Sequence, residues 1–338
     1  MDINLSKTFD YLRFPLALLV VYLHITYIPT SESYKYIDWS IYDGCYLYNL
    51  CVLFVCQIAR CAVPCFFLIA GYLLVVNISS LTLDTYVSKL SRRIKTLFIP
   101  YILWNLIAAL YLRFLVGMHI DNLIEIFIAP ANFPLWFLRN LIVLDIFFPL
   151  FYVSVRYMKW IGLVGLTIIY ILQPIHSFLG EYTCLSIYFF YLGIYGGIYK
   201  VSLKMIKNMY VVYGGIIFLI ITIYQVLTYG NMNLILQQLY LIVGVSTFII
   251  MAYVAIRKSR VNVNTFWASS SFFIYAFHRL GPTYVSKQIL FFLPDNNCYT
   301  DIIKFIFCPI ITVLLCVVIY KFCSLNIPRI LHIFTGGK

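Results

Sequence analysis

The stretch 1-MDINLSKTFDYLRFPLALLVVYLHITYIPT-30 decides how the rest of the chain is interpreted. An apolar run begins just after Arg13 and contains one histidine, His24, eleven positions further along the chain. Eleven helical steps end about 20° past three full turns, so both side chains leave one helix in the same direction, about 16 Å apart along its axis. The stretch predicts a first membrane span with a cation near one surface and an imidazole well inside.

An ionisable side chain at such depth is costly and marks a functional site by default. The simpler alternative is that His24 hydrogen-bonds a neighbouring helix, and for a histidine taken alone that alternative is favoured. The choice between the two therefore depends on what the rest of the chain places at the same depth.

The composition is that of a polytopic membrane protein. Hydrophobic residues make up 63% of the 338 residues and charged residues only 11%, against roughly 25% charged in soluble domains. The net charge of +12 is explained by basic loops on one side of a membrane, so no nucleic-acid partner is expected. None of the ten cysteines forms a CxxC pair, which argues against zinc. Cys45, Cys184 and Cys298 fall near one set of loops, where they could form a disulfide.

The remaining apolar runs are each long enough for about 30 Å of hydrocarbon. With the first span they predict an all-α polytopic membrane protein of about ten transmembrane helices. The nine further runs lie at about 45–76, 95–117, 134–155, 160–178, 184–200, 209–229, 234–256, 266–293 and 302–324.

The loops between these runs alternate in charge. Lysine and arginine gather in one set, of which 77–94 is the longest, and aspartate and glutamate in the other, which includes 30–44 and 118–133. Cytoplasmic loops carry the excess of lysine and arginine. We therefore expect both the N- and the C-terminus in the cytoplasm, and a single membrane-embedded domain over residues 1–338 with no attached soluble domain.

Several ionisable residues remain inside the predicted spans. His278 lies about a dozen residues into its run, at a depth similar to that of His24, which enters from the same side. Cations outnumber acids there, which favours an anionic ligand, although an interhelical network is about equally good for any single arginine. The residues are Arg13, His24, Arg60, Arg113, Arg139, Asp145, His278 and Arg279.

Five blocks of sequence resemble the membrane acyltransferase-3 family, which acylates surface glycans and other acceptors. They run in that family's order: DYLR followed by His24 (10–24), RCAVPCFFLIAGYLL (60–74), RRIKTLFIPY (92–101), PLWFLR (134–139) and SFFIYAFH (271–278). The chain departs from the family pattern at Pro15, at Ala70, where serine is usual, and at Lys95, where a second arginine is usual.

The resemblance implies an acyl-CoA donor on the cytoplasmic side, by default acetyl-CoA with succinyl as an option, and no metal. A sugar hydroxyl needs a base, and His24 would serve as that base or carry the acyl group itself. Arg13, at the lip of the cavity, and His278, as a supporting residue, would complete the catalytic group with His24. Arg92, Arg93 and Lys95 would bind CoA phosphates, although ordinary positive-inside bias explains them about as well. Candidates for binding substrate or its oxyanion are Arg60, Arg139, Trp136 and Tyr275.

The same resemblance implies a location in the bacterial plasma (inner) membrane. The expected partners are a glycan acceptor, membrane lipid and, as an option, other polysaccharide-assembly proteins. Two alternatives belong to other classes: a ten-span transporter of lipid-linked glycan, and a non-catalytic assembly subunit of the envelope. A transporter would show inverted repeats, and no repeat is evident in the sequence.

Overall fold

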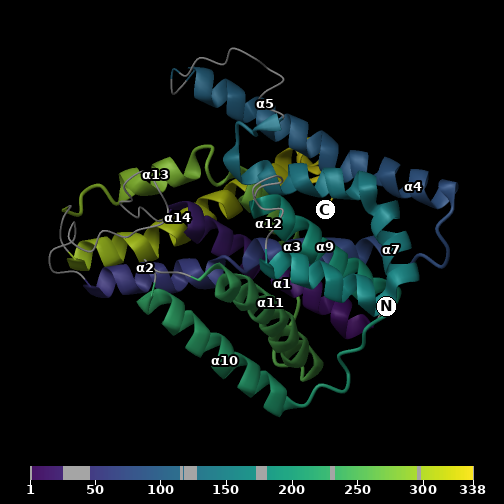
Figure 1. Cartoon of the computed structure of the whole chain (residues 1–338). Helices are drawn as coiled ribbons and strands as arrows, with labels where there is room; N and C mark the ends of the chain where they lie inside the picture. Colours follow the sequence, from purple (N-terminus) through teal and green to yellow (C-terminus); the bar gives the residue numbers. More distant parts are fainter. Residues whose placement is uncertain are drawn as a thin grey trace.

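The protein was analysed as a computed structural model, which describes residues 2–25, 46–114, 117, 128–172, 181–228, 233–294 and 298–337. Helices make up nearly all of these residues, and no strand occurs among them (Figure 1). In chain order they are α1 (Ile3–Ile25), α2 (Tyr46–Ala59), α3 (Ala62–Val75), α4 (Leu83–Arg93), the π-helix η1 (Ile94–Phe98), α5 (Ile99–Phe114), the 3-10 helix η2 (Phe133–Leu135), α7 (Trp136–Leu172), α9 (Glu181–Ile198), α10 (Asn208–Leu227), α11 (Leu234–Arg257), α12 (Thr265–Phe277), α13 (Pro282–Ile289), α14 (Cys298–Asn326) and α15 (Pro328–Thr335).

Within the described part of the chain, seven helical stretches are long and apolar enough to cross a membrane, and Tyr182–Ile198 is a shorter apolar helix. The prediction of an all-α polytopic membrane protein is confirmed. The count of ten spans and the cytoplasmic position of both termini stay predictions. Much of the acidic loop set, at 26–45, 118–127 and 295–297, lies outside the described residues.

Four predicted spans differ in detail from the helices observed, two because they are divided and two because they are joined. The run 45–76 is divided at Arg60–Cys61 into α2 and α3, and the run 266–293 is divided after His278 into α12 and α13. Gly281, at φ 151°, and Pro282 account for the second break, because few residues other than glycine adopt that backbone conformation. The expected loop between 155 and 160 is instead a sharp bend within α7 at Lys159, with φ 50° and ψ −130°.

Helix α1 lies at the centre of the bundle. It packs against α2, α3, α11, α12 and α14, which together surround it. Its buried side chains, among them Phe9, Leu16 and Val20, belong to the main apolar core. Helix α1 is therefore packed among five other helices. The pair α10 and α11 lies at the lower edge of Figure 1.

The closest helix pair is α3 with α9. A Cβ atom added at Gly71 would collide with the carbonyl oxygen of Phe190, and one added at Gly193 would collide with that of Leu68. Small residues let two helix backbones approach closely, which is how helices associate inside a membrane. These glycines let the backbones of α3 and α9 touch.

The cysteines expected near the outer loops differ in state. Cys298 is disulfide-bonded and Cys184 is a free thiol. Cys45 lies outside the described residues. A disulfide forms in an oxidising compartment, so Cys298 fits the extracytoplasmic side that the loop charges predict for it.

Candidate active site

His24 stands in the last turn of α1, half buried. Its Nδ1 lies 2.8 Å from the carbonyl oxygen of Val20, one turn earlier. A carbonyl oxygen only accepts hydrogen bonds, so Nδ1 carries the proton and donates it to this bond. The other ring nitrogen, Nε2, therefore keeps its lone pair, which a general base requires.

His278 caps the C-terminal end of α12 and is fully buried. Its Nδ1 lies 2.8 Å from the carbonyl oxygen of Tyr275 and 3.2 Å from that of Ile274. By the same reasoning Nδ1 is the protonated nitrogen. Its Nε2 is buried and has no hydrogen-bond partner among the described residues. Such an orphaned polar atom calls for an explanation, and an unbound substrate is one.

The structure brings the two histidines together. Their ring centres are 5.2 Å apart, and the ring planes are tilted by 45°. At that spacing a nitrogen of one ring can approach hydrogen-bonding distance of a nitrogen of the other. Neither imidazole forms an ion pair with a carboxylate in the part of the chain that the structure describes. Each ring is thus held by backbone carbonyls of its own helix and not by a carboxylate.

A cavity of about 120 Å³ lies between α1, α3, α4, η1, α7 and α12. Most of the side chains around it are apolar, and Arg13 and Arg93 are its only charged lining residues among those described. Tyr275 lines its wall and also supplies the carbonyl that holds His278, so the cavity reaches within one helical turn of the histidine pair. The lining residues are Arg13, Phe66, Ile69, Ala70, Leu73, Arg93, Leu97, Phe137, Leu138, Leu141, Ala268, Ser271, Phe272 and Tyr275.

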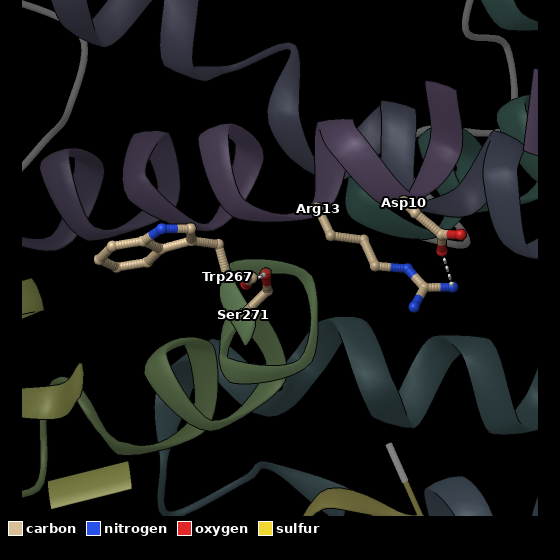
Figure 2. Close-up of polar contacts among 4 residues, drawn as sticks. All are labelled: Asp10, Arg13, Trp267 and Ser271. Atoms are coloured by element: carbon tan, nitrogen blue, oxygen red, sulfur yellow. Dashed lines mark hydrogen bonds and ion pairs between the residues drawn. The ribbon is translucent and has the colours of Figure 1, made fainter. Parts of the chain in front are cut away.

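Arg13 enters this cavity from α1. Its guanidinium Nη2 lies 3.2 Å from a carboxylate oxygen of Asp10, one turn earlier on the same helix. Figure 2 shows Arg13 reaching along α1 toward Asp10, with Ser271 and Trp267 on the neighbouring α12. The Ser271 hydroxyl donates to the Trp267 carbonyl at 2.8 Å. Arg13 thus has a carboxylate on one side and an apolar cavity on the other.

Of the three residues predicted to bind CoA phosphates, one lines the cavity and two do not. Arg93 lines the cavity and its Nε lies 3.2 Å from the buried carboxylate of Asp145 on α7. Arg92 and Lys95 are exposed and do not line the cavity. Asp145, one of the ionisable residues inside the predicted spans, thus pairs with Arg93.

The other predicted residues surround the site less closely, and only Tyr275 among them lines the cavity. Arg139 donates from Nε and Nη2 to the side-chain oxygen of Asn140, at 3.1 and 3.0 Å, and from Nη1 to the carbonyl of Ile128. Trp136 packs against Tyr182, with ring centres 4.6 Å apart. Arg60 lies at the break between α2 and α3.

Two features of the site were not predicted from the sequence. Asn132, buried directly before η2, donates to the carbonyl of Ala276 in the last turn of α12. Ala268 and Ser271 give the cavity its wall on α12. Nothing in the pattern around Asn132 marks it, because its partner is 144 positions away along the chain. Among the described residues, no group of three or more His, Cys, Asp or Glu side chains is placed to hold a metal ion.

Comparison with known proteins places these residues in a family. The model of the family described as "Acyltransferase domain" (Acyl_transf_3) matches residues 7–321. Succinoglycan biosynthesis protein ExoH of Rhizobium meliloti (strain 1021) is 27% identical over 228 residues, which are 62% of this chain and 58% of that protein. The aligned part is thus less than two thirds of this relative. No solved structure matches the chain.

Proposed function

The chain belongs to the membrane acyltransferase-3 family, and from this premise we propose that it transfers a short acyl group from cytoplasmic acyl-CoA to a glycan hydroxyl on the other side of the membrane. Acetyl is the default acyl group and succinyl the alternative. The observation that carries the proposal is the paired imidazoles one helical turn beyond an arginine-bearing apolar cavity. The name of the relative links that protein to succinoglycan biosynthesis, which favours a polysaccharide or its lipid-linked precursor as the acceptor here.

The cavity suits the thioester end of acyl-CoA. Its walls from α3, α7 and α12 are mostly apolar, and Arg13 and Arg93 supply the positive charge that an anionic donor needs. The exposed Arg92 and Lys95 lie on the basic side, where they would attract the phosphates of CoA without entering the cavity. The donor would thus reach the histidine pair from the cytoplasmic half.

His24 is the proposed base. Its Nε2 lone pair takes the proton of the acceptor hydroxyl while the hydroxyl oxygen forms a bond to the thioester carbonyl carbon. When the tetrahedral intermediate collapses, the carbon–sulfur bond breaks and the proton passes to the sulfur, which gives an ester and free CoA. Transfer through an acyl-His24 intermediate uses the same residues and remains the alternative route.

His278 is proposed to stabilise protonated His24. Because Nδ1 of His278 donates to the Tyr275 carbonyl, its Nε2 is an acceptor, suited to an N–H on His24 once that ring gains a proton. With Nδ1 already donating to a backbone carbonyl, a neutral His278 has no free N–H to donate to the oxyanion. Its role is therefore to accept the new N–H of protonated His24. The partner that fixes the tautomer of His24, which is the carboxylate in the Ser-His-Asp arrangement, is here the Val20 carbonyl.

Mass spectrometry of surface glycan tests the function, in cells that carry the wild-type gene, no gene or a histidine variant. Without the gene the glycan should lose its acyl groups. His24→Ala should also abolish them, because a general base contributes about 10²- to 10⁴-fold in rate. His278→Ala should leave partial acylation, since water can replace part of its hydrogen bonding.

His332→Ala is the matched control, because His332 is exposed on α15 and away from the cavity lining. Protein in the membrane is quantified for each variant. Near wild-type acylation by His24→Ala would refute the mechanism, and unchanged acyl-CoA consumption in a strain without the gene would favour a transporter. Loss of both histidine variants from the membrane would point to a structural role instead.

A further inference from the structure

The segment Asn132–Pro134 contacts His24 and the turn of α12 directly before His278. Asn132 is buried, with 2% of its surface exposed, and its side-chain Nδ2 donates to the carbonyl of Ala276 at 2.7 Å. In the opposite direction, the hydroxyl of Tyr275 donates to the carbonyl of Pro134. Two hydrogen bonds thus join this segment to the last turn of α12, directly before His278.

The middle residue of the segment reaches the other histidine. Phe133 lies edge-on to the ring of His24, with ring centres 6.1 Å apart. Its two neighbours along the chain are held by α12, while Phe133 contacts α1. The segment therefore links the end of α1, which carries His24, to the end of α12, which is followed by His278.

The end of α12 needs such support. The last carbonyls of a helix have no partner within the helix, and helix ends fray unless other groups satisfy them. Beyond α12 the chain turns at Gly281, with φ 151°, and the carbonyls of Phe277 and His278 accept from the backbone N–H groups of Leu280 and Thr283. The Ala276 carbonyl is not among those that this turn satisfies. Asn132 supplies the missing donor to the Ala276 carbonyl, two residues before His278.

We propose that Asn132 is a positioning residue for acyl transfer, which sets the place of His278 against His24 through its hydrogen bond to Ala276. This inference rests on the proposed function of the histidine pair. Loss of the hydrogen bond should displace the end of α12 without changing the arginines of the cavity. A misplacement of about 1 Å near reacting groups costs about 10²-fold in rate.

The test compares Asn132→Leu with Asn105→Leu. Asn105 is also fully buried, but its Nδ2 donates within its own helix, to Tyr101 at 2.9 Å. Free CoA released from acetyl-CoA is measured in inverted membrane vesicles that contain the native acceptor. Asn132→Leu should lower the maximal rate by about 10- to 100-fold and leave the KM for acetyl-CoA unchanged. Asn105→Leu should leave both near the wild-type values.

A spectroscopic measurement tests the positioning without any substrate. Protein labelled with ¹⁵N in its histidines is purified in detergent, and single His→Gln variants assign the signals. Asn132→Leu should shift the ring signals of both His24 and His278, whereas Asn105→Leu should shift neither. Unshifted histidine signals in a folded Asn132→Leu protein would overturn the inference, as would a wild-type maximal rate.

A second variant decides the matter if Asn132→Leu does not fold. Phe133 is half exposed, so Phe133→Leu keeps an apolar side chain and should fold. It should shift the His24 signal and lower the maximal rate by about threefold, and the absence of both effects would count against the inference. Failure of the proposed function is separable, because it would appear as activity in His24→Ala whatever the Asn132 variants do.

Discussion

The arginines of the cavity and the histidines beyond it are held in opposite ways. Each arginine has a carboxylate from the same chain, Asp10 for Arg13 and Asp145 for Arg93. Each histidine is held by backbone carbonyls of its own helix. One half of the site is thus built from charges that neutralise each other, and the other half from groups that are neutral.

The difference follows from the chemistry of the two side chains. A guanidinium is charged at all accessible pH values, so an arginine below the membrane surface needs a neighbouring acid. An imidazole can be neutral near pH 7, and a backbone carbonyl is enough to fix its tautomer. Charge therefore belongs in the half proposed to bind an anionic donor, and a neutral base in the half proposed to activate a hydroxyl.

The largest effect on stability is expected from removing one member of the buried ion pair between Arg93 and Asp145. Asp145 is 2% exposed and Arg93 24% exposed, so Asp145→Asn should leave Arg93 without its counter-charge. We expect a loss of about 3 kcal/mol in the free energy of unfolding, measured by thermal or denaturant unfolding in detergent. The double variant Arg93→Met with Asp145→Leu should recover much of that loss, because it buries no charge.

Asp10→Asn is the control for that experiment. The Asp10 side chain is 41% exposed and that of Arg13 25%, so solvent screens their attraction. Its effect on unfolding should be under about 1 kcal/mol. Equal destabilisation by Asp10→Asn and Asp145→Asn would contradict the burial-based distinction between the two pairs.

Much of this arrangement was predictable because it depends on spacing within one helix. Arg13 and His24 share a side of α1 because eleven residues make about three turns. The helical class, the membrane location and the family also followed from the sequence, and each is confirmed. The break after His278 had a signal as well, since Gly281-Pro282 is a turn-forming pair.

What could not be predicted depends on contacts between distant segments. Arg92 and Arg93 are adjacent in a basic run, yet only Arg93 faces Asp145, 52 positions away. Which arginine turns inward depends on how α4, η1 and α7 pack, and a single sequence does not contain that register. Asn132 escaped notice for the same reason, because its partner carbonyl lies on α12.

A smaller effect is expected from removing the charge of Arg13, and it concerns donor binding. Arg13→Gln keeps a polar side chain but removes the charge that faces the cavity. A hydrogen bond to a charged group contributes about 1.5–3 kcal/mol, so the KM for acyl-CoA should rise by about tenfold or more while the maximal rate changes less. The kinetics are measured in inverted vesicles. A fall in maximal rate at unchanged KM would place Arg13 in the chemistry of transfer instead of donor binding.

The smallest effect concerns the exposed cations outside the cavity. Arg92→Ala combined with Lys95→Ala should raise the KM for acyl-CoA by only about threefold, because exposed charges contribute through long-range attraction. The difference from wild type should vanish in about 1 M salt, where the Debye length is about 3 Å. A difference that persists in high salt would show that these residues contact the donor directly.

The glycine contacts between α3 and α9 have a mechanical consequence. Phe66, Ile69, Ala70 and Leu73 of α3 form one wall of the cavity, and backbone-to-backbone packing at Gly71 and Gly193 ties that wall to α9. Two helices in such contact move as one rigid body. Any widening that admits a donor must therefore come from the other walls, which include Arg93 and Leu97 on α4 and η1 and Ser271 and Phe272 on α12.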